Sequence, residues 1–148
     1  MNRIHTKKLM SAFVALLVSQ GVSARDDRIK LSIADALSSA DAQAKLNPAI
    51  KLYWGTQAYA KTGQALSEYT AKKLMNGALK SDKSACDSTF LATLIALQER
   101  ASAEGGNAVV NIRSLYHDEE VSSETDYVCS AGMVTAEVGL RGNIVKLP

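Results

Sequence analysis

The amino-acid sequence predicts an α+β fold, in which an antiparallel sheet packs against one long helix. Between residues 82 and 104, apolar residues recur at spacings of three and four, which is typical of one helix face. Ile50, Leu52 and Trp54 instead follow the two-residue period of a half-buried strand. Further strand-like segments follow the helix. No internal repeat, low-complexity tract or Pro/Gly/Ser-rich linker divides the chain, so we expect one domain.

The segment before the first predicted strand is expected to form short helical pieces. Residues 33–37 form one helical turn in this interpretation, and Asp41 caps a second short helix that runs to Leu46. After the strand at residues 50–54, residues 66–74 fit either a second strand or a helix, because their Ala, Leu and Lys residues are good helix formers. Asn76-Gly77 then indicates a turn.

The clearest predicted element is a helix from Asp82 to Glu104. Ser81 or Asp82 can cap its first turn, and Gly105-Gly106 is expected to end it, because glycine adopts the left-handed conformation at helix C-termini. Its apolar stripe should face the sheet and consists of Cys86, Phe90, Leu94, Leu97 and Ala101.

The remainder of the chain is predicted to be strands. Residues 108–113 form one strand, with Val110 and Ile112 on the same face. A polar stretch at residues 117–126 separates it from a last long strand at 127–140. Residues 141–143 then turn the chain into a terminal strand at 144–147.

The last long strand is expected to contain an irregularity at Gly132. Cys129 and Ala131 share one parity before this glycine, whereas the apolar residues after it, from Val134 to Leu140, have the opposite parity. An extra residue inserted as a β-bulge would bring both sets to the same face, and glycine tolerates the backbone angles that a bulge requires.

The N-terminus has the pattern of a removable signal peptide. Residues 2–8 carry three positive charges and no acid, residues 9–18 are mostly apolar, and residues 22–24 are small. The apolar run is shorter than the roughly 20 residues that cross a membrane. We therefore predict that residues 1–24 are a signal peptide, that residues 25–148 form the mature domain, and that this domain is exported to the periplasm. An ordinary cytosolic N-terminal helix is the alternative.

The predicted cleavage changes the charge of the protein. Removing Arg3, Lys7 and Lys8 from the 17 basic residues leaves 14 against 15 acidic residues, a net charge of −1. Nucleic-acid affinity depends largely on neutralising phosphates, so no nucleic-acid partner is expected. No second apolar run is long enough to span a membrane, and no cysteine precedes Cys86, so lipid attachment after the cleavage site is not expected.

Cys86 and Cys129 are the only two cysteines. A lone pair in a small exported domain favours a disulfide bond, which would close a long loop and stabilise the fold by about 4 kcal/mol at most. Two free thiols, or a metal site with ligands elsewhere, are the alternatives. Zinc sites usually show paired cysteines or clustered histidines, and neither pattern occurs here.

Several segments together resemble a family of small exported bacterial proteins whose members often carry the label "excinuclease ATPase subunit". They cover most of the mature chain: residues 85–86, 97–101, 105–112, 121–125, Cys129 and 140–147. An ATPase of that kind needs the loop G-x-x-x-x-G-K-[ST] to hold phosphate. No Gly-Lys pair occurs in this sequence, so neither ATP hydrolysis nor a nucleotide cofactor is expected.

The helix followed by Gly-Gly-Asn-Ala-Val-Val-Asn-Ile is more distantly similar to YbjQ-like domains and to the related outer-membrane lipoprotein that senses envelope stress. This resemblance covers residues 85–140. It implies a helix paired with an antiparallel sheet and leaves a homo-oligomer open, because some of the similar proteins form rings. The anchor cysteine of the lipoprotein is absent here.

The segment from residue 117 to residue 126 contains the densest cluster of candidate metal ligands. Oxygen ligands suit calcium, and a histidine suits a softer metal. The spacing lacks the central glycine of the calcium-binding loop, and a solvated acidic hairpin loop is the simpler interpretation. The candidate ligands are His117, Asp118, Glu120, Glu124 and Asp126.

No catalytic residue is predicted. Nucleophilic catalysis needs a base near a Ser or Cys, and His117 is the only histidine left after cleavage. Glu119 and Glu120 would project to opposite sides of a strand, which is poor geometry for a shared acid–base role. Four aromatic residues between residues 53 and 69 fit either core packing, which is the more common use, or a ligand groove: Tyr53, Trp54, Tyr59 and Tyr69.

From its sequence, we expect the chain to be a non-enzymatic periplasmic domain that binds a protein partner or a small ligand. We expect its role to lie in envelope homeostasis. A metal-binding protein that uses the 117–126 loop is the first alternative, and an enzyme of unrecognised type is the second. No cofactor is expected.

Overall fold

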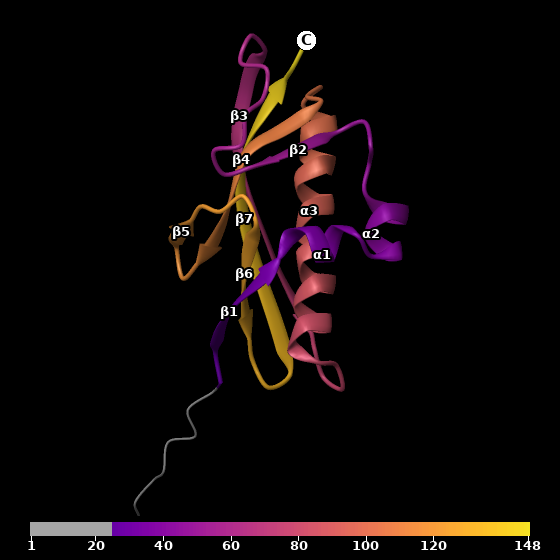
Figure 1. The fold of residues 1–148 in the computed structure, drawn as a ribbon, viewed down its shortest axis with the longest axis vertical. Coiled ribbons are helices and arrows are strands. Elements are labelled where there is room, and N and C mark those ends of the chain that lie inside the picture. The colour runs from indigo at the N-terminus through magenta and orange to yellow at the C-terminus, as the bar shows by residue number, and fades with distance from the viewer. Residues whose placement is uncertain (1–24) are drawn as a thin grey trace, which may run out of the picture.

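The computed structural model describes residues 25–148, so the predicted signal peptide and its cleavage after Ala24 lie outside the described residues. Figure 1 shows the long helix lying against a curled sheet. In chain order the elements are β1 (Asp27–Ser32), α1 (Ile33–Leu37), α2 (Ala40–Lys45), β2 (Lys51–Trp54), β3 (Gln64–Asn76), α3 (Asp82–Ala103), β4 (Ala108–Tyr116), β5 (Glu119–Val121), β6 (Asp126–Ala131) and β7 (Thr135–Lys146).

β7 is the central strand of the seven-stranded sheet. It pairs with β3 along its whole length on one side, and with β6 and then β4 on the other. β1 extends the sheet beyond β6, while β5 and β2 both pair with β4. The β2–β4 pair is parallel and the other pairs are antiparallel. The predicted α+β class, with an antiparallel-dominated sheet and one long helix, is confirmed.

The long helix α3 begins and ends as the sequence predicts. The Ser81 side chain accepts a hydrogen bond from the backbone N–H of Ser84, which caps the first turn. Gly105, with φ at 78°, follows the last turn. The helix packs on β7 and β3, and its predicted stripe is buried throughout: Cys86, Phe90, Leu94, Leu97 and Ala101.

Aromatic rings from three elements pack against one another in the core. Phe90 of α3 lies between Trp54 of β2, at a centroid distance of 5.6 Å, and Tyr127 of β6, at 3.9 Å. The Tyr127 hydroxyl is buried and donates a hydrogen bond of 2.6 Å to Asp87. Burial, and then this bond to a carboxylate, raise the pKa of the Tyr127 hydroxyl. The core therefore joins the N-terminal half of the chain to the strands that follow the helix.

Cys86 and Cys129 form the predicted disulfide bond. Their Cα atoms lie 5.9 Å apart, within the usual range for a disulfide, and both side chains are fully buried. The bond ties the first turns of α3 to β6 across the core.

The predicted strand at residues 127–140 is wrong, because the chain reverses direction after Ala131. Gly132 donates its N–H to the carbonyl of Thr135 at 2.8 Å, and β6 and β7 form a hairpin. This turn, rather than a bulge, accounts for the change in parity.

The predicted turn at residues 141–143 is also wrong, because β7 continues through them. Gly142 is needed there for packing: a Cβ atom would lie 2.5 Å from Cγ1 of Val109.

Val110 and Ile112 do not share a face of β4, contrary to the prediction. The register of β4 against β7 shifts between Val110 and Arg113, and Asn111 adopts a left-handed φ of 49°. Ile112 therefore packs in the main core beneath α3. Val110 packs in a small separate cluster with Val145.

Candidate functional site

His117 and Asp118 form the two-residue turn between β4 and β5. Their φ angles are 47° and 64°, and two left-handed residues are what a type I′ hairpin turn requires. The Nε2 atom of His117 lies 2.7 Å from a carboxylate oxygen of Asp26. The first two polar residues of this segment therefore form a hairpin turn.

The remaining candidate metal ligands point to different partners. Glu120 binds two arginines, Glu124 accepts a hydrogen bond from the Thr56 hydroxyl at 2.8 Å, and Asp126 accepts one from Thr125 at 3.2 Å. Across residues 25–148, no group of three or more His, Cys, Asp or Glu side chains could hold a metal ion. The structure does not bring the five candidates together.

Two arginines and two glutamates form an ion-pair cluster on the face of the sheet that points away from α3. Arg113 and Arg141 are direct neighbours on β4 and β7. Glu120 bridges them, with oxygen–nitrogen distances of 2.8 and 2.7 Å, and Glu68 of β3 lies 2.7 Å from Arg113. The hydrogen bonds from Arg113 and then Arg141 hold the pKa of Glu120 below its ordinary value. The charges of the cluster balance, and its ion pairs join β3, β4, β5 and β7.

Glu120→Gln is expected to reduce the pH dependence of stability. Because the pKa of Glu120 is depressed in the folded state, its ionised form stabilises the fold above its unfolded pKa of about 4.3. This contribution is lost as the pH falls from there through the folded pKa. Urea unfolding between pH 7 and pH 3 should show a smaller acid-induced loss for E120Q than for the wild type. Glu119→Gln, whose carboxylate lies 3.6 Å from Arg28, is the control and should keep the wild-type profile. Parallel profiles for E120Q and wild type would contradict this assignment.

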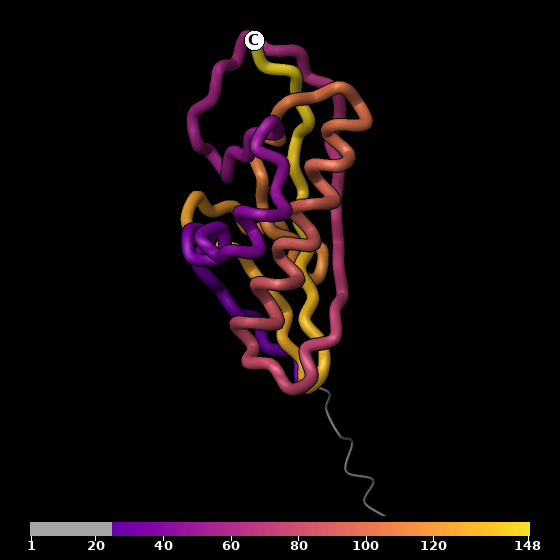
Figure 2. Tube along the Cα trace, turned by 90° about the vertical axis from the view of Figure 1, so that its right-hand side faces the viewer, coloured from indigo at the N-terminus to yellow at the C-terminus, as the bar shows by residue number. Residues whose placement is uncertain are grey.

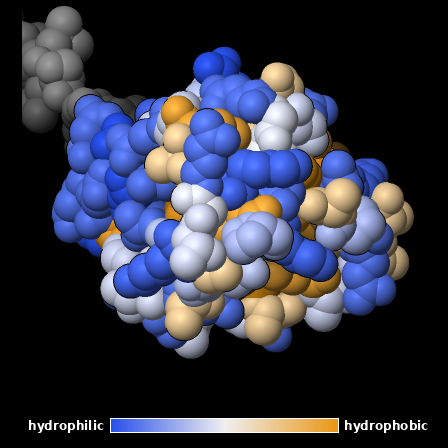
Figure 3. Space-filling view, turned by 90° about the horizontal axis from the view of Figure 1, so that it is seen from above, coloured by the Kyte–Doolittle hydropathy of each residue, from blue (hydrophilic) through white to orange (hydrophobic). Residues whose placement is uncertain are grey.

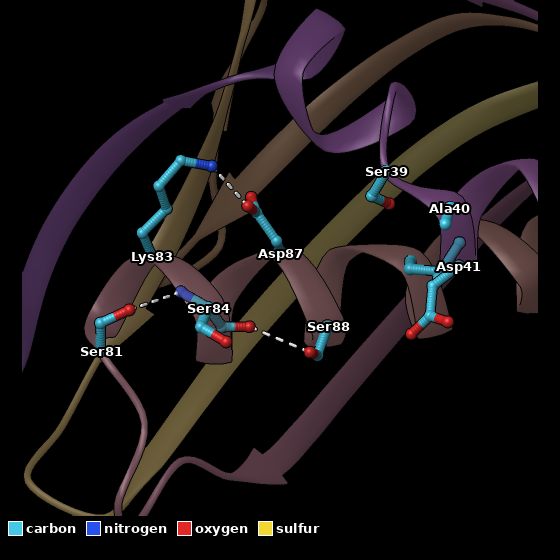
Figure 4. A pocket seen from close by; sticks show the side chains of 9 residues that line it. Ser39, Ala40, Asp41, Ser81, Lys83, Ser84, Asp87 and Ser88 are labelled. Carbon is cyan, nitrogen blue, oxygen red and sulfur yellow. Dashed lines mark hydrogen bonds and ion pairs between the residues drawn. The ribbon is translucent and has the colours of Figure 1, made fainter.

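A serine-rich hollow of about 470 Å³ lies between α2 and the first turns of α3 (Figure 4). Ser81 caps the helix, and the Ser88 hydroxyl donates to the carbonyl of Ser84 at 2.9 Å. Lys83 lies 2.6 Å from Asp87. No histidine lines the hollow, and the hydrogen bond to Asp87 raises the pKa of Lys83, which makes this lysine a poorer base for a neighbouring serine.

Buried polar side chains within residues 25–148 are hydrogen-bonded. Gln98 of α3, for example, accepts a hydrogen bond from the N–H of Asn47 and donates to the carbonyls of Asn47 and Ile50. Within residues 25–148, no buried side-chain nitrogen or oxygen lacks a hydrogen-bond partner.

The four aromatic residues predicted as a core cluster or a ligand groove do not form one cluster. Trp54 lies in the main core. Tyr53 and Tyr59 pair at 5.8 Å and pack on the separate cluster around Val110. Tyr69 packs at the edge of the main core and lies under Arg100. Core packing accounts for Trp54, and these residues line no common groove.

Exposed large apolar side chains gather at one end of the molecule, here called the apolar end. It consists of the last residues of β3, the loop before α3 and the β6–β7 turn, at the lower end of Figure 1. The N–H of Gly77 donates to the carbonyl of Val134 at 2.8 Å, which holds the two loops side by side. All exposed large hydrophobic residues of the described chain belong to this end: Leu74, Met75, Leu79, Met133 and Val134.

Leu79 is the most exposed residue of the apolar end. Its relative exposure is 108%, and its φ angle is 64°, in the left-handed region. That conformation costs a leucine about 1–2 kcal/mol relative to a right-handed one. The side chain gains nothing from core burial, so folding does not explain a leucine at this position.

Positive charge borders the apolar end. Lys73 and Lys80 have no ion-pair partner within residues 25–148, whereas Lys72 pairs with Glu137 and Arg25 pairs with Asp82. The opposite end of the molecule, seen in Figure 3, is mostly hydrophilic, and hydrophobic residues show there only as separate areas. The two ends therefore differ in surface chemistry.

No family model, curated protein or solved structure that was compared with the chain matches it. Within residues 25–148, no helix is both long and apolar enough to cross a membrane. The candidate site consequently rests on surface geometry, which favours the apolar end over the polar hollows.

Proposed function

We propose that the chain is an exported, non-enzymatic domain that docks a partner protein through its apolar end. The observation that carries this proposal is the concentration there of the five exposed large hydrophobic residues found within residues 25–148. Exposed large apolar side chains gathered at one end of a small domain are typical of an interaction site, because water contact with them is unfavourable until a partner covers them.

The side chains of the apolar end favour a protein over a lipid surface as the partner. Two of the five are methionines, which adapt to irregular protein surfaces and are enriched in protein interfaces. None is a tryptophan or tyrosine, the residues that typically anchor a protein at a membrane interface. Because Lys73 and Lys80 lie at the border, we expect the partner's surface to have an apolar centre surrounded by acidic residues.

Export is supported by the basic, apolar and small-residue order of residues 2–24. The buried Cys86–Cys129 disulfide is compatible with an oxidising compartment. The resemblance to small exported bacterial proteins points the same way. We propose the periplasm as the compartment, envelope homeostasis as the setting and a YbjQ-like arrangement of helix and sheet.

Replacing Leu79 and Met133 together by asparagine is expected to remove the partner without unfolding the domain. Both side chains are exposed, and asparagine tolerates the left-handed backbone of position 79 better than leucine does. Burying one such side chain in an interface contributes about 1.5–3 kcal/mol, so the association constant for the partner should fall at least tenfold. The measurement is native mass spectrometry of the protein purified from its own envelope fraction.

The control is Lys61→Asn, in an exposed loop away from the apolar end, which should keep the partner. Urea unfolding should show that the double variant is as stable as the wild type. Partner retention by the double variant at the wild-type level would overturn the proposal. The assignment to a protein partner would be overturned if the wild type sedimented with phosphatidylglycerol vesicles and the double variant did not.

A further inference from the structure

β3 is the longest strand of the sheet and has one unpaired edge. It pairs with β7 along one side, and no strand within residues 25–148 pairs with the other. Figure 2 shows it running alone along one side of the molecule, with α3 covering a face of the sheet rather than this edge. A free row of backbone N–H and C=O groups is a template for another strand.

The charges along β3 identify the strand that would fit. Its regular part, Ser67 to Asn76, contains one acidic residue, Glu68, and two lysines, Lys72 and Lys73. Such a strand complements itself in an antiparallel pair if Glu68 faces a lysine of the second copy. Opposite charges that face each other across a pair stabilise it, and like charges destabilise it.

Symmetry restricts the registers of a self-pair. Two copies that join antiparallel along one edge are related by a two-fold axis perpendicular to the sheet, so residues that face each other must point to the same side. Their numbers then differ by an even amount, which excludes Glu68 facing Lys73 and allows Glu68 facing Lys72. That register is centred on Thr70. Registers centred on Lys72 or Lys73 would place a lysine against its own copy.

We propose that two copies of the chain pair antiparallel along β3, with Thr70 of one copy facing Thr70 of the second. Glu68 and Lys72 then form an ion pair twice across the two-fold axis, and the sheets become continuous.

Contacts already present in the chain place the required side chains on one face. Thr70 accepts a hydrogen bond from Arg141 at 2.9 Å, Glu68 lies 2.7 Å from Arg113, and Lys72 lies 3.0 Å from Glu137. Glu68 and Lys72 are about half exposed, so each can take a second partner. The apolar end shares Leu74 and Met75 with β3, whereas Leu79 and Met133 lie in loops beyond the strand. Substitution of Leu79 and Met133 therefore tests docking of a partner protein without changing the residues that pair along β3.

Thr70→Cys tests the register directly. Cβ atoms of facing residues lie about 4.5–5.5 Å apart, close to disulfide range, and both native cysteines are already bonded and buried. Under mild oxidation, T70C should form a covalent dimer at least tenfold faster than Leu74→Cys, on the same strand face. In the proposed register the two copies of residue 74 are eight positions apart, or about 26 Å. Equal rates, or faster crosslinking of L74C, would overturn the proposal.

A second measurement does not depend on the added thiol. Sedimentation equilibrium of the mature wild type should show a dimer whose dissociation constant rises at least tenfold in Lys72→Glu, because two carboxylates then face each other. Lys72→Gln, which removes attraction without adding repulsion, should lie between them. A wild type that stays monomeric at high micromolar concentration, or a dimer that K72E leaves unchanged, would contradict pairing along β3.

Discussion

Reduction of the Cys86–Cys129 disulfide is expected to lower the free energy of unfolding by about 3–4 kcal/mol. The bond links residues 43 positions apart. Closing a loop of that length lowers the conformational entropy of the unfolded chain, which stabilises the fold by about 4 kcal/mol. Strain in the bond or residual structure in the unfolded chain reduces this stabilisation. The melting temperature should fall by roughly 10–20 °C. Urea and thermal unfolding of oxidised and reduced protein provide the measurement.

The reduced wild type is the appropriate comparison because it keeps both sulfur atoms in the core. A Cys86→Ala, Cys129→Ala double variant should lose more, since it also leaves a cavity where two fully buried side chains were packed. If oxidised and reduced wild type unfold at the same urea concentration, the bond does not stabilise the fold as proposed.

Phe90→Ala is expected to destabilise the domain by about 3–5 kcal/mol. Phe90 is 1% exposed, stacks on Tyr127 and packs against Trp54, so its removal leaves a cavity between two large side chains. This loss is a large fraction of the 5–15 kcal/mol that typical domains possess. Urea unfolding followed by circular dichroism measures it.

Phe90→Leu serves as the control, because leucine fills part of the same space and should cost markedly less. A loss below about 1 kcal/mol for F90A would mean that the stacked rings are not the centre of the core.

The helix α3 could be predicted because local and tertiary signals agree. The stripe from Cys86 to Ala101 follows the helical period, Ser81 offers a cap, and Gly105 follows the last turn. Each signal lies within a few residues of the feature that it specifies. The disulfide was predicted from the cysteine count together with the expected export, and the structure confirms the pairing.

Elements that depend on distant partners were harder to predict. The β6–β7 turn contains Met133 and Val134, apolar residues that do not indicate a reversal of the chain. For β3, helix-forming residues left two interpretations open, and pairing with β7 decides for a strand. β1 was missed, although Ile29 and Leu31 alternate with basic residues in the two-residue period of a strand.

The apolar end could not be predicted from the sequence. Met75 and Met133 are far apart along the chain, and only the pairing of β3 with β7 brings their neighbourhoods together. An exposed leucine also looks the same in a sequence as a buried one. Conversely, the acidic segment 117–126 resembled a ligand set, while its first two residues serve the β4–β5 turn.

Photo-crosslinking from position 79 tests the proposed docking surface most directly. A photoreactive phenylalanine analogue is placed at Leu79, or at Lys61 as the control, and the protein is irradiated in its own cells. Because Leu79 is fully exposed at the apolar end, we expect a covalent adduct with a defined partner protein from position 79 and none from position 61. Absence of an adduct at position 79, or the same adducts from both positions, would contradict docking through the apolar end.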